Sequence, residues 1–247
     1  MLYLENFFTT TFNLNIYLIV IIAILYIFIH HNRQHVINQY LDIYFNYIPV
    51  LTHEFGHVLF NKISGGKAKD LVIVMRPSER LQTMQQGYAI TQSKHLIGQC
   101  ITTLGGYVMP PLMLLIGLSA AHYNHPSLFL TAYIFIFIYY LFLTSRKVSP
   151  IIVLIILAKL LYFLIQHDNQ TLIYYGVLLS YHMILGLLLG EVLQSSWTIF
   201  NLTFQKPTPS WDGHTLATMT RLPTILFSIL WITINFFSLY LMFKFTI

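Results

Sequence analysis

The sequence predicts an all-α polytopic membrane protein with about seven transmembrane helices and a small cytosolic-side β-hairpin after the second. Of its 247 residues, 56% are hydrophobic and only 9% are charged. A soluble domain has about 25% charged residues, and a chain with so few could not cover its surface with polar groups. The bilayer is therefore the expected solvent.

Seven apolar runs carry this prediction, because a spanning helix needs about 20 mostly apolar residues. The runs cover residues 12–31, 43–63, 96–120, 127–143, 149–166, 172–193 and 222–243. The first has no basic segment before it and no evident cleavage site after it, so we expect a retained helix. We treat residues 1–247 as a single membrane-embedded domain.

Two connections are long, residues 64–95 and 194–221, and the first is too polar to span. Its runs "DLVIVM" and "GYAITQ" are rich in strand formers, and glycine and proline punctuate them. They predict a hairpin inserted at the inner interface. Its free edge could pair with an extended substrate, or the hairpin could only plug the mouth of a cavity; the sequence leaves both open.

The cations predict an orientation. If the seven spans alternate, ten of the thirteen lysines and arginines fall on one side: Lys62, Lys67, Lys69, Arg76, Arg80, Lys94, Arg146, Lys147, Lys206 and Arg221. The opposite connections, 32–42, 121–126 and 167–171, hold only Arg33. The positive-inside rule then places the N-terminus and both long loops in the cytosol. The net charge of +5 does not indicate nucleic acid, because the cations form no basic face.

The stretch "HEFGH", residues 53–57, lies inside the second apolar run. On a helix His53 and His57 share one face, one turn apart, so both imidazoles can reach one metal ion. Glu54 stands beside them as a candidate general base for a metal-activated water. Ionisable groups at membrane depth are functional candidates by default. Pro49, four residues earlier, predicts a kink that opens room beside the motif.

A catalytic zinc site needs a third protein ligand. The candidates are Asp212, His214, Glu191, His95, His182 and Asp168. If the second span stands upright, His57 and His53 lie roughly 9 and 15 Å above its inner end. That depth favours Asp212, in the cytosolic loop before the last span, and excludes Asp168. Glu191, His182 and His214 stay as alternatives. His214 could instead form a hydrogen bond to one of the ligands without touching the metal.

Four blocks, in this order and spacing, resemble the site-2 protease family of intramembrane zinc metalloproteases, especially its small bacterial branch lacking a PDZ domain. They are "HEFGHVLFNKISGGKAKDLVI", "QGYAITQ", "LGGYVMPPLMLLIG" and "SWDGHTLATMTRLP". The resemblance implies Zn²⁺ held by His53, His57 and Asp212, with Glu54 as the general base. Many relatives carry a tighter Asn-Pro-Pro run before the aspartate. Here Asn201 is set apart from the prolines, which puts its oxyanion role in doubt.

The sequence therefore predicts a zinc metalloendopeptidase that hydrolyses membrane-embedded proteins or peptides near the cytosolic leaflet. We expect an integral multi-pass protein of a bacterial cell membrane, with its active site towards the cytosol. One alternative is a non-hydrolytic metal-binding or zinc-transporting protein, although the outer halves of the spans are almost bare of carboxylates. Another is a non-catalytic relative that only tethers helices, against which the intact Glu54 argues. The sequence indicates no oligomeric state.

Overall fold

The computed structural model describes residues 7–166 and 170–246, and almost all of its elements are helices. The helices are α2 (Ile16–His31), α3 (Val36–Phe45), α4 (Tyr47–Ile63), α5 (Pro77–Thr83), α6 (Leu96–His122), α7 (Pro126–Leu143), α8 (Val148–Gln166), α9 (Gln170–Phe204), α10 (Asp212–Thr220) and α11 (Thr224–Thr246). Two strands, β1 (Lys67–Ile73) and β2 (Gly87–Gln92), complete the fold.

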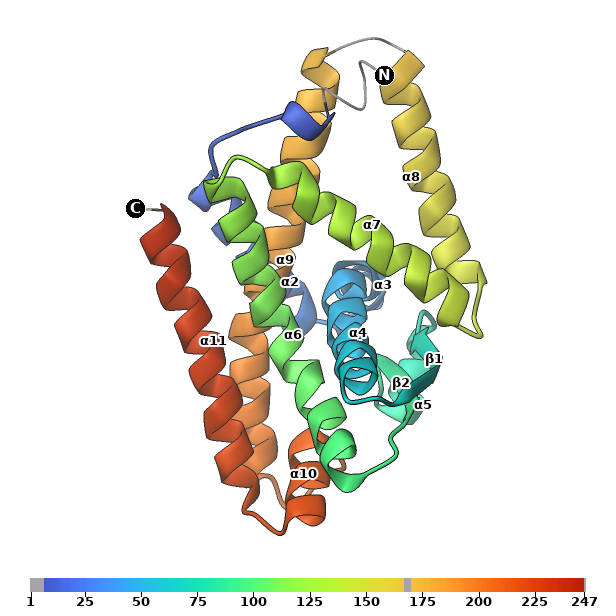
Figure 1. The fold of residues 1–247 in the computed structure, drawn as a ribbon, viewed down its shortest axis with the longest axis vertical. Helices are drawn as coiled ribbons and strands as arrows, with labels where there is room; N and C mark the ends of the chain where they lie inside the picture. The colour runs from blue at the N-terminus through green and yellow to red at the C-terminus, as the bar shows by residue number, and fades with distance from the viewer. Residues whose placement is uncertain (1–6, 167–169, 247) are drawn as a thin grey trace.

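Three long helices, α6, α9 and α11, run along the long axis of the molecule, whereas α4 is seen nearly end-on in the same view (Figure 1). The helix that carries the His-Glu-Phe-Gly-His stretch therefore lies across the bundle. Its closest partner is α6. α7 runs obliquely and leads to α8, which stands at the edge of the fold (Figure 1).

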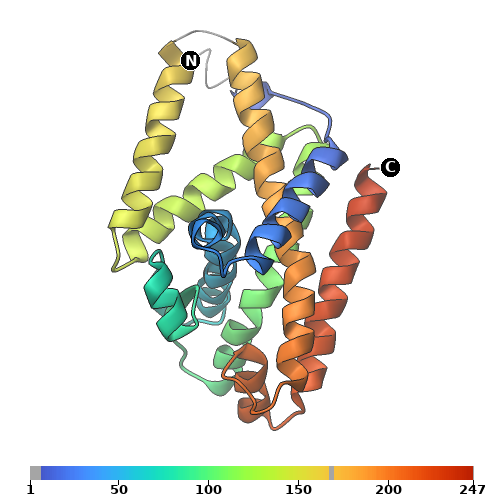
Figure 2. The ribbon, with the colours of Figure 1, turned by 180° about the vertical axis from the view of Figure 1, so that it is seen from behind.

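α2 packs along α9 at the back of the molecule (Figure 2). A Cβ on Gly186 would lie 2.5 Å from Ile22, and one on Gly190 would lie 2.5 Å from the ring of Tyr26. The two glycines therefore let α2 and α9 approach closely.

The polar insertion forms a two-stranded antiparallel sheet, in which Leu71 pairs with Ala89 and Ile73 with Gly87. This confirms the predicted sheet. The strands are not joined by a tight turn, because α5 lies between them. Both strands pack on α4, so the sheet covers one flank of that helix.

Four of the described helices are long and apolar enough to cross a membrane: α6, α7, Tyr174–Phe204 of α9 and Thr224–Phe245 of α11. Ile16–His31 and Val148–Lys159 are apolar but shorter. The predicted count of seven spans is thus not confirmed. Of the other three predicted spans, two correspond to these shorter helices, and residues 43–63 correspond to neither group.

That run is broken in two, because α3 ends at Phe45 and α4 begins at Tyr47. The break lies at Asn46, three residues before the predicted kink at Pro49. Pro49 falls in the first turn of α4, where backbone N–H groups have no partner within the helix, so its missing donor costs little there. Asn46 is buried, and its side-chain amide donates to Asp42 over 2.5 Å.

The predicted alternation also assumed that residues 43–63 span, and this run is not among the four candidate spans. Arg80, in the loop after α4, pairs with Asp42, in the segment before it, at 3.3 Å. Residues 32–42 and 64–95 thus meet beside α4. The N-terminal segment lies against the start of α7, because Ser127 donates to the carbonyl of Phe8.

Candidate metal centre

Close packing of α4 on α6 sets the position of the two histidines. A Cβ on Gly56 would lie 2.4 Å from the carbonyl oxygen of Gly105, so the backbones touch there. One step further along α6, a Cβ on Gly106 would lie 2.5 Å from Nε2 of His57 and 2.7 Å from Nε2 of His53. Only a residue without a side chain leaves room for both imidazoles.

Three ligand atoms converge beside this contact. Nε2 of His53 and Nε2 of His57 are 3.2 Å apart, and Oδ2 of Asp212 lies 3.5 and 3.4 Å from them. Tetrahedral zinc, with bonds of about 2.0–2.1 Å, holds its nitrogen and oxygen ligands roughly 3.3–3.4 Å apart. The triangle has the size that one zinc ion requires. No other such group of three occurs among the residues that the structure describes.

The hydrogen bonding of His57 fixes which nitrogen can bind a metal. Its Nδ1–H donates to the backbone carbonyl of Thr102 over 2.9 Å. A neutral ring therefore presents the lone pair of Nε2 to the centre of the triangle, as a ligand must. The ring of Tyr107 stands edge-on to His53, with centroids 4.8 Å apart, and restricts its rotation.

Asp212 is the first residue of α10, which packs on α6 and α11. Trp211 anchors this start: its ring lies under Gly213 and against Trp231. Burial raises the pKa of the Asp212 carboxyl, but the neighbouring His57 and His53 outweigh it and hold this pKa below its usual range. The carboxylate is ionised, which suits a metal ligand.

Glu54 is buried on the flank of α4 that the sheet covers. A Cβ on Gly87 would lie 3.1 Å from its Cγ, and the N–H of Ala89 is within hydrogen-bonding reach of its carboxylate. β2 thus forms a wall that holds Glu54 beside the triangle.

The other candidate ligands lie elsewhere. Glu191 accepts from the hydroxyl of Tyr26, and Nε2 of His182 accepts from the backbone N–H of Asn15. His95 is exposed before α6, and His214 lies within α10 outside the triangle. Asp168 lies outside the described residues.

The chain matches a known protein family. The model of the family described as Peptidase M50B-like matches residues 16–242, nearly the whole chain. The chain belongs to the peptidase M50B-like family. M50B-like peptidases are of the site-2 protease kind, as the four sequence blocks indicated, so this one is a membrane metallopeptidase. No curated protein and no solved structure matches the chain.

Sequence reasoning missed several groups of this M50B-like site. Thr102 acts through a carbonyl, which no side-chain pattern reveals. Tyr107 stood in the resembling block "LGGY" without an assigned role, whereas Gly105 and Gly106 beside it indicated a helix packed tightly at the active site, as the structure has it. Asn201 was considered for oxyanion binding; it is exposed on α9. Among the described contacts, none joins Asn201 to the three ligand atoms.

Proposed function

We propose that the protein is a zinc-dependent intramembrane endopeptidase in which Glu54 is the general base and His53, His57 and Asp212 hold the metal. The observation that carries the proposal is the triangle of ligand atoms, 3.2 to 3.5 Å on each side, with a buried carboxylate next to it. Zinc in this site would polarise the scissile carbonyl and lower the pKa of water towards about 7.

The residues of the site would transfer the proton and orient the reacting groups. Glu54 takes a proton from the attacking water and returns it to the leaving amine. The N–H of Ala89 and the wall formed by β2 keep its carboxylate oriented. Thr102 and Tyr107 keep the imidazoles from turning.

The substrates we propose are membrane-embedded proteins or peptides, cut at the end of the molecule where the basic loops gather. The packing of β2 on Val50 and Glu54 supports its role as a wall of the site. Pairing of β2 with an extended substrate remains the alternative, since the sheet has only two strands.

Glu54→Gln tests the function directly. The variant keeps the ligand triangle, so we expect zinc bound as in the wild type and cleavage slowed by at least about 100-fold. Membrane proteomes of cells carrying each form should differ in shortened single-span proteins, and those substrates can then be assayed with purified enzyme. Glu79→Gln makes the same chemical change on α5, where the carboxylate pairs with Arg146 outside the triangle; it is the matched control and should cleave normally. Cleavage by Glu54→Gln at the wild-type rate would remove Glu54 as the base.

The second candidate function is metal binding or zinc transport without hydrolysis. A transport path needs further ligands along the bundle. The described residues hold only one group of three, and Glu191 and His182 are engaged in other hydrogen bonds. Zinc uptake by vesicles containing Glu54→Gln would favour this alternative.

A further inference from the structure

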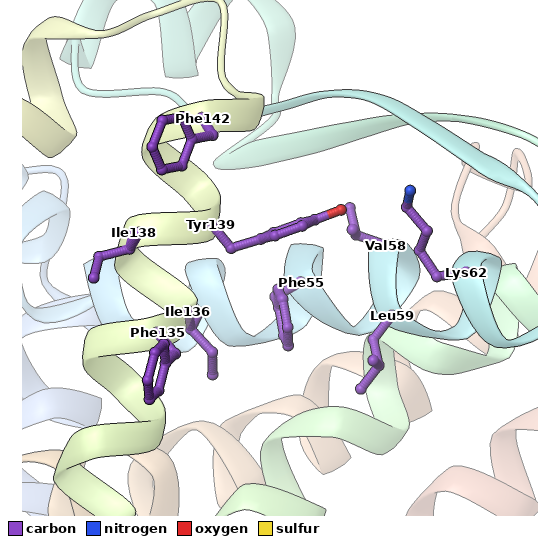
Figure 3. Close-up of a pocket in the computed structure, with 9 residues that line it drawn as sticks. All are labelled: Phe55, Val58, Leu59, Lys62, Phe135, Ile136, Ile138, Tyr139 and Phe142. Carbon is purple, nitrogen blue, oxygen red and sulfur yellow. The ribbon is translucent and has the colours of Figure 1, made fainter.

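A groove of about 600 Å³ lies between α4 and α7 (Figure 3). α4 contributes Phe55, Leu59 and Lys62, and α7 contributes Ile138, Tyr139 and Phe142. Phe55 and Leu59 each follow a histidine ligand by two residues, which places them roughly 200° around the helix from the metal site. The groove is therefore separate from the catalytic centre, on the opposite face of the same helix.

The groove has an apolar body and one polar end. Its lining is aromatic and aliphatic except for the ammonium of Lys62 and the hydroxyl of Tyr139. In Figure 3 these two groups point to the same side of the groove. The ring of Tyr139 is edge-on to Phe55, with centroids 6.0 Å apart, so it forms a wall of the groove. Within the described chain, no carboxylate forms an ion pair with Lys62.

The size of the groove suits a small ligand. Its volume lies within the range of about 300–1,000 Å³ that is typical of small-molecule sites. A single flexible acyl chain can fill it.

Charge indicates the head group. Lys62 is in the last turn of α4, which leads into β1, with Lys67 and Lys69. This is the basic end of the molecule, and basic sites between membrane helices on the cytoplasmic side bind anionic lipid head groups. We propose that the groove binds one anionic phospholipid, with an acyl chain against Phe55 and Leu59 and its phosphate at Lys62 and Tyr139.

The lipid would stabilise α4 by packing on the face opposite the metal site. α6 and the sheet pack on two other faces of α4, and the lipid covers the face that lines the groove. Binding therefore stabilises the fold, and it does not depend on hydrolysis. The Glu54→Gln protein should bind the lipid as the wild type does, so this inference can fail or hold independently of the proposed function.

The test is native mass spectrometry of purified full-length protein titrated with phosphatidylglycerol or phosphatidylcholine, together with thermal unfolding in the same detergent. We expect one tightly retained phosphatidylglycerol and a raised unfolding midpoint. Lys62→Gln should weaken phosphatidylglycerol about fivefold, since one basic residue near an anionic lipid contributes about 1 kcal/mol. Lys94→Gln, an exposed cation outside the groove, is the matched control and should change nothing. Ile138→Trp, which fills the groove, should weaken both lipids.

Four results would overturn the proposal. Lys62→Gln could retain phosphatidylglycerol as the wild type does, or Lys94→Gln could lose it equally, which would reduce the effect to general charge. Ile138→Trp could leave lipid retention unchanged, which would place the lipid elsewhere. A photoreactive residue at position 138 could crosslink a peptide substrate instead of lipid, which would make the groove a peptide site.

Discussion

Gly106→Ala should expel the metal without touching a ligand. The new Cβ would lie 2.5 Å from Nε2 and 2.6 Å from Cε1 of His57, and 2.7 Å from Nε2 of His53. Ordinary contact begins near 3.4 Å, so the imidazole of His57 has to retreat by about 0.9 Å. Metal–ligand distances tolerate only about 0.2 Å. One methyl group therefore displaces both rings beyond bonding range.

The expected loss of zinc affinity is at least about 100-fold, the upper end of the loss seen when a neighbour of a metal ligand is removed. Zinc retained by the purified protein against graded chelator concentrations measures it, and cleavage activity should fall in parallel. Gly98→Ala is the matched control on the same helix, because its Cβ would meet Ser64 Oγ at an ordinary 3.4 Å. That variant should bind zinc normally.

A second control separates metal loss from unfolding. A Cβ on Gly117, nearer the other end of α6, would lie 2.6 Å from Leu185 and 2.9 Å from Phe129, with no ligand nearby. Gly117→Ala should lower thermal stability by about 1–3 kcal/mol and leave zinc affinity intact. If Gly106→Ala binds zinc as tightly as the wild type, the imidazoles do not pack against α6 and the described centre is wrong.

Three further predictions concern other parts of the molecule. Asp212→Ala should lower the zinc content of purified protein well below one ion per chain; unchanged content would transfer the third-ligand role to another residue, with His214 the nearest in sequence. Asp42→Asn should lower the free energy of unfolding in detergent by roughly 3 kcal/mol, because it leaves the nearly buried Arg80 without its charged partner; an unchanged unfolding midpoint would contradict this. In a Cys100→Ser background, Ser78→Cys should react with an impermeant thiol reagent only from the cytosolic side and His125→Cys only from outside, and the reverse pattern would invert the proposed orientation.

The sequence predicted the parts of the fold that depend on local pattern. Four long helices follow from their largely apolar composition, and the sheet follows from strand formers between glycines and prolines. The pairing of His53 with His57 needs only the helical repeat. The prediction that Asp212 lies close to them depended on the expected depth of these residues in the membrane and on the family resemblance.

The second apolar run was misread for a physical reason. The average hydropathy of a run does not show that its individual polar residues need hydrogen-bonding partners. Such residues here are Asp42, Asn46, His53, Glu54 and Asn61, and several of their partners are distant in sequence. Arg80 pairs with Asp42 across 38 positions, and Ser93 and Thr102 accept from Asn61. Partners of that kind hold α4 across the bundle. The estimate of 9 and 15 Å for the histidines assumed an upright helix, so it does not describe their depth.

The proposed ligand set has a consequence for biosynthesis. Two of its members are made early, on α4, whereas the third is made more than 150 residues later, at the start of α10. A ribosome-bound chain that ends before α10 can offer a metal only the two imidazoles. The complete metal site can therefore form only after nearly all of the helices have been synthesised. An incomplete chain cannot hydrolyse the nascent proteins around it.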